Sequence, residues 1–409
     1  MTETIIFEHA FMIDGTGAEP LPDVSLVVEN GLIREIKSGG KRAKVPEGRV
    51  IDLKGKTLMP GLIDAHVHPG NVEWFLSRTA ALPPAVYVHR VTRTLETDLA
   101  LGFTTLRDAG GLDEGFRAAV EQGFIKGPRL LLSVTPLSRP EGTGGKGPSP
   151  RNSLGICPEV CDGADDMRAA VRRTIRRGAD QIKVFADGEV VSQSESDRAR
   201  PGQPKFSVEE LRAAVREAEE AVKYVMAHTY GPKAIQNCLE AGVRSIEHGN
   251  FIDAETAQMT AQKGAFYVPT LTIYDLLTGE GRDELDARTL EKLKIVGHRG
   301  IEALETAYRA GVNIASGTDI IGPLQHLKGR ELAIKAEVLG PMGAIVSTTR
   351  TNAELMGLSE RIGTLESGKV ADLIVLDGNP LKDMTLFESG LERVLLVMKQ
   401  GRIMKEMGL

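Results

Sequence analysis

The order of apolar and polar residues divides the chain into three parts. Residues 1–58 alternate apolar and polar side chains in short stretches such as 32–36, and the pattern returns near the other end in 371–376. Alternation with a period of two is typical of β-strands that have one buried face. Asn30-Gly31 lies between two such stretches and indicates a tight hairpin. We therefore predict a small β-sandwich domain built from both termini, residues 1–58 and 367–409.

The central part of the chain, residues 59–366, alternates apolar strands with amphipathic helical segments. Ser207 and Glu210 have the spacing of a capping box, which marks the start of one helix. Eight short apolar stretches are predicted strands: 61–68, 104–106, 129–134, 181–185, 224–228, 245–248, 266–270 and 312–316. Strands that alternate with helices form parallel sheets. Eight such units predict an α/β fold, a (β/α)8 TIM barrel.

Composition limits the number of domains, the kinds of partner and the compartment of the protein. The 409 residues are 41% hydrophobic, which is enough for one large and one small domain. The formal net charge of −6 offers no basic field, so we expect no nucleic-acid partner. The N-terminus lacks the features of a secretory signal, and no apolar run is long enough to cross a bilayer, so we expect a cytoplasmic protein without a membrane partner. The odd number of cysteines, Cys157, Cys161 and Cys238, fits reduced structural thiols in that compartment.

The first strand of the central part ends in two histidines, His66 and His68. Residues two apart on a strand point to the same face. In a parallel barrel this face is the interior, and the carboxyl ends of the strands carry the chemistry. The pair has the geometry of metal ligands, although two histidines that only make core hydrogen bonds would fit this motif about equally well.

Other polar residues end predicted strands in the same way. Lys183 interrupts an apolar strand, where a charged ammonium is unfavourable to bury. His228 and His248 end the fifth and sixth strands, and Asp319 follows the eighth. Each alone is weak evidence, but five such sites in barrel order are difficult to explain by packing. Together they predict a metal centre.

With these motifs the sequence resembles the amidohydrolase superfamily over nearly its whole length. The resemblance rests on Lys183 and on residues 61–68, 227–230, 246–250, 317–319 and 368–373. Residues 107–111 and 247–253 are most similar to the branch of metallo-dipeptidases, prolidase-like enzymes and ochratoxinase, which is related to imidazolonepropionase. Members of this superfamily are commonly homo-oligomers, so the resemblance implies a homo-oligomer acting on a small-molecule substrate.

The resemblance also implies a binuclear centre of two divalent metal ions, usually zinc. Lys183 would be carboxylated by carbon dioxide, and the resulting carbamate would bridge the metals. The remaining ligands would be His66, His68 and Asp319 for one metal, and His228 and His248 for the other. A hydroxide between the metals is then the nucleophile at neutral pH.

Catalytic roles follow for two residues under this resemblance. Asp319 would take the proton of the nucleophile and deliver it to the departing nitrogen. Tyr230, two residues after His228, would donate a hydrogen bond to the developing oxyanion. Packing under a loop is the alternative role of Tyr230.

Substrate selection is expected from the Gly-rich loop at 138–148. Arg139 and Lys146 lie there among glycines, and a cationic loop can bind a carboxylate. Lys146 stands where the branch carries a histidine. We therefore expect an amide whose leaving group is an α-amino acid, as in a dipeptide, an N-acyl amino acid or an ochratoxin-type amide. Solvated surface charges are the alternative for both side chains.

Three other functions use related machinery. A cyclic-amide or lactone hydrolase would bind the same metals, and only the loops would distinguish it. A deaminase normally carries a glutamate three residues after the histidine of the fifth strand, where this chain has Gly231, and needs no lysine at position 183. A non-catalytic scaffold would not need a complete ligand set. We therefore favour the amide hydrolase.

Overall fold

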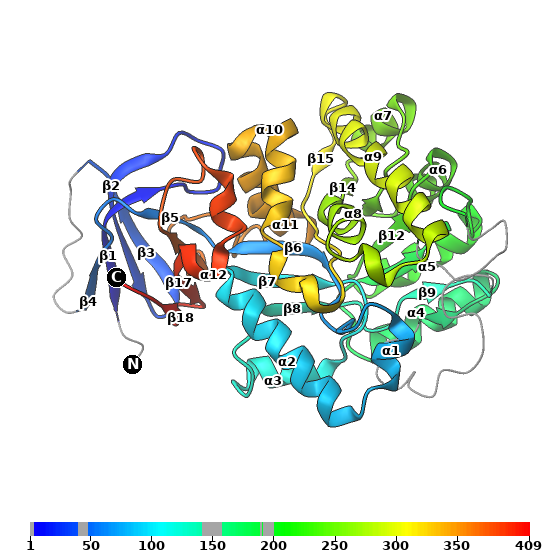
Figure 1. The fold of residues 1–409 in the computed structure, drawn as a ribbon, viewed down its shortest axis with the longest axis horizontal. Helices are drawn as coiled ribbons and strands as arrows, with labels where there is room; N and C mark the ends of the chain where they lie inside the picture. The colour runs from blue at the N-terminus through cyan, green and yellow to red at the C-terminus, as the bar shows by residue number, and fades with distance from the viewer. Residues whose placement is uncertain (1–3, 40–47, 141–157, 189, 191–199) are drawn as a thin grey trace.

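The strands from the two ends of the chain pair in one sheet. The computed structural model describes residues 4–39, 48–140, 158–188, 190 and 200–409. Among these, eight strands form the terminal sheet, on the left of Figure 1, in which β4 pairs with β1 beside the order β18-β17-β16-β5-β1-β2-β3. They are β1 (Ile5–Met12), β2 (Leu21–Glu29), β3 (Leu32–Lys37), β4 (Arg49–Asp52), β5 (Thr57–Pro60), β16 (Leu373–Leu376), β17 (Val394–Lys399) and β18 (Arg402–Glu406). Both chain ends lie on this side of the molecule.

The predicted hairpin at Asn30-Gly31 is confirmed. Strands β2 and β3 pair antiparallel up to Glu29 and Leu32. Asn30 and Gly31 both have positive φ, 53° and 81°. These values match the two-residue turn whose twist suits paired strands.

The eight predicted central strands are all present, and every pairing among them is parallel. They are β6 (Leu62–Val67), β7 (Phe103–Asp108), β8 (Arg129–Leu132), β11 (Ile182–Phe185), β12 (Val225–Thr229), β13 (Ser245–His248), β14 (Phe266–Val268) and β15 (Asn313–Ile314). Strands β6, β7 and β8 form one sheet, and the others form a second with β9 (Leu137–Ser138) and β10 (Glu159–Val160). The Asp180 N–H donates to Leu132 O at 2.7 Å, and the Ala65 N–H donates to Ser316 O at 2.8 Å. These bonds join the β8 edge of the smaller sheet to the start of β11, and its β6 edge to the segment that follows β15.

Several strands are shorter than the pattern predicted, β14 and β15 among them. Thr270 has a φ of 48° and directly precedes α8, so a helix begins where strand continuation was expected. After Ile314, the Asn352 side chain accepts from Ser316 N at 2.8 Å and donates to Ser316 O at 2.9 Å. The Asn352 side chain thus binds the Ser316 N–H and shares the Ser316 carbonyl with Ala65 of β6.

Helices cover the parallel strands on the outside (Figure 1). The capping box at Ser207 and Glu210 is present at the start of α5. The helices are α1 (Leu76–Ala81), α2 (Pro84–Ala100), α3 (Glu114–Glu121), α4 (Ala164–Arg176), α5 (Val208–Glu220), α6 (Pro232–Ala241), α7 (Ala254–Gln262), α8 (Leu271–Thr278), α9 (Ala287–Arg309), α10 (Arg330–Thr348), α11 (Arg350–Leu355) and α12 (Gly390–Arg393). In the described part of the chain, none of them has the length and apolar character to cross a membrane.

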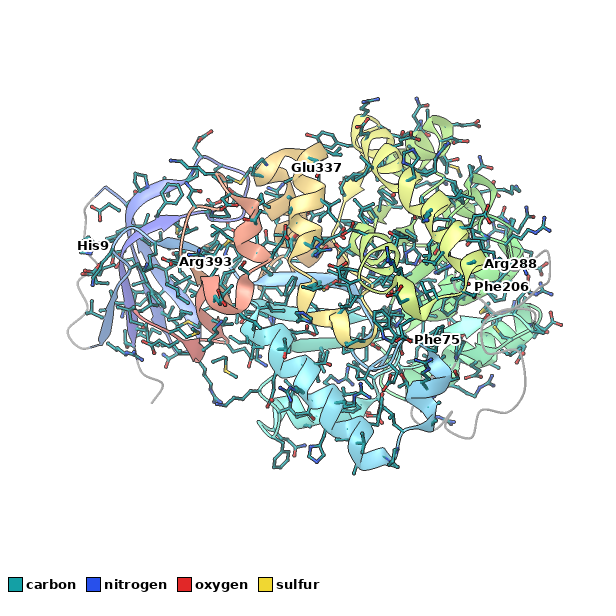
Figure 2. All side chains as sticks on the ribbon, viewed as in Figure 1. His9, Phe75, Phe206, Arg288, Glu337 and Arg393 are labelled. Carbon is teal, nitrogen blue, oxygen red and sulfur yellow. The ribbon has the colours of Figure 1, made fainter. Side chains whose placement is uncertain are left out.

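Side chains fill the space between strands and helices, as Phe206 does before α5 (Figure 2). Cys161 and Cys238 are buried free thiols, as predicted, and Cys157 lies outside the described residues. Burial raises the pKa of the Cys161 thiol to about 12. The terminal sheet is tied to the central strands by an ion pair of 2.6 Å between Arg129 and Asp372.

Candidate metal centre

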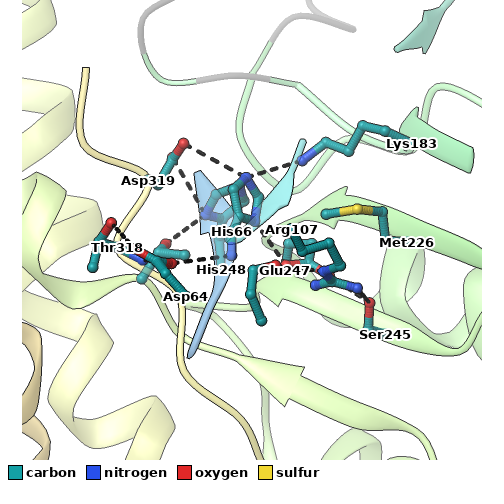
Figure 3. A network of polar contacts seen from close by, with 12 residues as sticks. Asp64, His66, Arg107, Lys183, Met226, Ser245, Glu247, His248, Thr318 and Asp319 are labelled. Atoms are coloured by element: carbon teal, nitrogen blue, oxygen red, sulfur yellow. Dashed lines mark hydrogen bonds and ion pairs between the residues drawn. The ribbon is translucent and has the colours of Figure 1, made fainter. Parts of the chain in front are cut away.

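Three of the predicted metal ligands, His66, Lys183 and Asp319, lie in one polar network, and His248 lies beside them (Figure 3). The Asp319 carboxylate contacts both His66 and His68. Its Oδ1 lies 3.5 Å from His66 Nε2 and 3.3 Å from His68 Nε2. One ligand atom from each of these three residues lies within 4.8 Å of the others. The structure therefore brings together side chains from the first and last of the eight strands.

Hydrogen bonds fix the orientation of both imidazoles. The Nδ1 of His68 donates to Gly110 O at 2.7 Å, and a carbonyl can only accept. The Nδ1 of His66 lies 2.7 Å from a Glu247 carboxylate oxygen, which likewise accepts. In both rings the hydrogen is thus on Nδ1. Each Nε2 presents a lone pair toward Asp319.

Lys183 lies beside this triad. Its side chain is 1% exposed, and its Nζ is 3.2 Å from His66 Nε2. Figure 3 shows the amine pointing toward the His66 imidazole from β11, in which Lys183 is the second of four residues. The residue that interrupts an apolar strand in the sequence therefore ends in the cluster of histidines.

His228 and His248 form the second half of the cluster. Their ring centroids are 4.5 Å apart, and the His248 ring is 5.0 Å from that of His66. Tyr230 stacks on His248 at 5.4 Å and meets the edge of His228 at 4.9 Å. Its hydroxyl is 3.4 Å from that of Tyr274. Tyr230 is therefore buried next to both rings.

Three residues at this site have a left-handed backbone conformation. His248 has a φ of 70°, Thr270 of 48° and Asp319 of 54°. Such angles are unfavourable for side chains with a Cβ, and they cluster at functional sites. Thr270 Oγ1 also lies 2.7 Å from His248 Nδ1, so this strained segment orients the ring.

Burial keeps the four imidazoles neutral. Burial, together with the positive charge of Lys183, lowers the pKa of His68 to about 4. Burial is also the largest cause of the lowered pKa values of His66, His228 and His248. Burial raises the pKa of the Asp319 carboxyl to about 7, and the charge of Lys183 opposes this shift. Neutral imidazole is the form that binds metals.

The donor set fits a divalent cation. Two imidazole lone pairs and a carboxylate oxygen point to one place, and such groups repel one another unless a cation lies among them. Imidazole nitrogens and carboxylate oxygens are the ligands that Zn²⁺ binds. His228 and His248 supply further nitrogen donors at the same end of the strands. The residues present therefore suit metal ions better than a core network.

Comparison with known proteins agrees with this chemistry. Residues 57–404 match the sequence model of the Amidohydrolase family. The chain is 30% identical to ochratoxinase from Aspergillus niger, over 99% of this chain and 87% of that protein. The chain belongs to the amidohydrolase family. This amidohydrolase is thus a hydrolase, and the predicted resemblance to the branch that includes ochratoxinase is confirmed.

Solved structures show the same relationship. A prolidase in complex with N-methylphosphonate-L-proline has a TM-score of 0.93 at 35% identity, covering 98% of this chain and 100% of that chain. A Xaa-Pro dipeptidase with bound methionine in the active site has a TM-score of 0.86 at 28% identity, covering 98% and 99%. The fold of this amidohydrolase is therefore shared with hydrolases that act on peptides.

Only one of the two predicted carboxylate-binding residues lies in the described part of the chain. Lys146 lies outside the described residues. Arg139 Nη2 is 2.8 Å from the Asp162 carboxylate, and its Nη1 is 3.3 Å from that of Glu210. A substrate carboxylate would have to share Arg139 with these two acids.

The amidohydrolase site also contains charged residues to which the sequence analysis assigned no role. Arg107 and Glu247 are fully buried and pair at 2.8 Å. Arg107 also donates to Ala65 O and to Ser245 Oγ, so it joins three strands behind His66. A charged residue within or next to a predicted strand was the signal in the sequence for both Arg107 and Glu247.

Proposed function

We propose that this amidohydrolase is a binuclear metal-dependent hydrolase, with zinc as the metal, that cleaves the amide bond of dipeptides or N-acyl amino acids. The arrangement of His66, His68 and Asp319 around one point is the observation that carries the proposal. His228 and His248 would hold the second ion. The parallel strands would form a (β/α)8 barrel over residues 59–366, beside a small β-sandwich domain of residues 1–58 and 367–409.

Lys183 would join the two ions. Its amine attacks the carbon of carbon dioxide and loses a proton, which gives an anionic carbamate with two oxygens. The nearly complete burial of Lys183 supports this step, because an uncompensated ammonium is unfavourable there. The 3.2 Å separation of its Nζ from His66 Nε2 supports a role for Lys183 as a further ligand.

The proton transfers would belong to Asp319. Two divalent cations, when bound, lower the pKa of a water between them and so supply a hydroxide nucleophile at neutral pH. The Asp319 carboxylate is partly exposed, at 21% of its side-chain surface, and faces both His66 and His68. It would accept the proton of the nucleophile and release it to the leaving nitrogen.

Tyr230 would stabilise the oxyanion. Its ring is held between His228, His248 and Phe251, so its hydroxyl has little freedom to move. Burial raises the pKa of this phenol well above its ordinary value, so the hydroxyl remains a hydrogen-bond donor. A preorganised donor of this kind stabilises charge that develops in the transition state.

The substrate proposal draws on the relatives. The prolidase, the Xaa-Pro dipeptidase and ochratoxinase are similar to this chain over nearly its whole length. Metal ions bind the carbonyl and distinguish little else, so loops at the ends of the strands must select the leaving group. A free carboxylate on a leaving α-amino acid, bound by Lys146 and by Arg139, is the simplest feature for a cationic loop to recognise.

Comparing a dipeptide with its C-terminal amide tests this choice. We expect kcat/KM for the acid to exceed that for the amide by about 10-fold or more, the effect of one charge-assisted hydrogen bond. Lys146→Ala should lower kcat/KM for the acid and leave that for the amide unchanged. Exposed Lys126 follows α3 at the other end of the strands, so Lys126→Ala is the matched control. Equal turnover of acid and amide by the wild type would contradict the proposed carboxylate recognition.

A further inference from the structure

Asp187 is a buried carboxylate just after β11 that has no part in the proposed catalytic steps. It is fully buried. Its Oδ2 accepts hydrogen bonds from Tyr230 N at 2.6 Å and Gly231 N at 3.1 Å, with Thr229 Oγ1 at 3.3 Å. One oxygen therefore holds the chain at the end of β12, where His228 and Tyr230 are placed.

The other oxygen faces His228. Asp187 Oδ1 lies 4.0 Å from His228 Nε2. Both atoms are buried, and within the described residues neither has a hydrogen-bond partner. Buried polar atoms normally have partners, and these two face each other as possible acceptor and donor. A small rotation of the ring would bring them into hydrogen-bond distance.

His228 is oriented in the opposite way from the other three histidines. His66, His68 and His248 all make their hydrogen bond through Nδ1. In His228 it is Nε2 that faces a carboxylate. Because a carboxylate can only accept, it favours the neutral tautomer with hydrogen on Nε2. The lone pair of His228 is then on Nδ1.

We infer that Asp187 is a positioning residue that fixes the tautomer of His228, so that Nδ1 is the atom available to the second metal ion. The inference rests on the proposed binuclear centre. Partners of this kind set the tautomer and basicity of a histidine ligand.

The substitution Asp187→Asn changes the partner of His228 but keeps an acceptor for the backbone of the loop after β12. The N–H groups of Tyr230 and Gly231 require an acceptor, so the amide oxygen must take the place of Oδ2. The amide nitrogen then faces His228 Nε2, and two donors cannot pair. His228 is expected to move its hydrogen to Nδ1, where it blocks a metal ion. The loop keeps both backbone bonds.

The tautomer can be read in metal-free protein by NMR of ¹⁵N-labelled histidine at pH 8. We expect His228 to carry hydrogen on Nε2 in the wild type and on Nδ1 in Asp187→Asn, with His228→Gln used to assign the signal. Asp180→Asn, at the amino end of the same strand, is the matched control and should retain the wild-type tautomer. Hydrogen on Nδ1 of His228 in the wild type would overturn the inference, whether or not the variant folds.

Zinc titration of the same proteins gives a second readout. We expect Asp187→Asn to bind one ion as the wild type does and the other about 10- to 100-fold more weakly, the range for loss of a partner to a metal ligand. Unchanged affinity for both ions would overturn the inference. A wild type that binds fewer than two ions would instead contradict the proposed function, and the NMR result would still decide the role of Asp187.

Discussion

Asp319→Asn is expected to lower kcat by about 10³-fold or more, because positioned general acid–base groups contribute about 10²- to 10⁴-fold. The amide can neither accept the proton of the nucleophile nor deliver one to the leaving nitrogen. The side chain is partly exposed and lies 3.3 Å from His68 Nε2, so the substitution changes the site without opening a cavity in the core. Steady-state kinetics on a cleaved dipeptide measure the effect.

Asp165→Asn provides the matched control. Asp165 is almost fully exposed on α4, with 99% of its side-chain surface accessible. It should retain wild-type kcat and thermal stability. If Asp319→Asn kept a kcat within about 10-fold of the wild type, the proton-transfer role of Asp319 would be wrong.

Lys183→Ala is expected to lower kcat/KM by more than about 10²-fold, because loss of even an indirect partner of a metal ligand changes affinity or activity by about 10- to 100-fold. The substitution removes the bridging carbamate and leaves a space where the buried side chain was. Short carboxylic acids such as propionate should enter that space and partly restore activity. Kinetics with and without added acid measure both effects.

Lys183→Met distinguishes rescue from a general salt effect. Methionine fills much of the space that lysine occupied, so an added acid should not restore its activity. Full activity of Lys183→Ala without added acid would contradict the carbamate. Equal rescue of both variants would show that the acid acts elsewhere.

The sequence was sufficient to predict most of the side chains that the structure brings together at the candidate metal centre. His66, Lys183 and His248 are polar residues in buried strands, and such placement is unfavourable unless the side chains find partners at a site. Period-two alternation also predicted which side chains share a face. The structure places these side chains within a few ångströms of one another, as the ring distance of 5.0 Å between His66 and His248 shows.

The partners of these residues could not be predicted in the same way. Glu247 contacts both His66 and Arg107. These contacts depend on how β6, β7 and β13 are rotated about their axes, and residue spacing does not contain that information. The early end of the strand at Thr270 is similar, since its left-handed backbone is imposed by tertiary contacts rather than by its own preference. The opposite orientation of His228 also depends on Asp187, from a different strand.

The metal content of the wild-type protein tests the binuclear centre most directly. Elemental analysis of protein purified with zinc and bicarbonate is expected to give about two divalent ions per chain, because the six proposed ligands supply more donors than one tetrahedral site uses. His66, His68 and Asp319 account for one ion, and His228 and His248 for the other, with Lys183 shared. A value that stays at one or below under these conditions would contradict the binuclear centre.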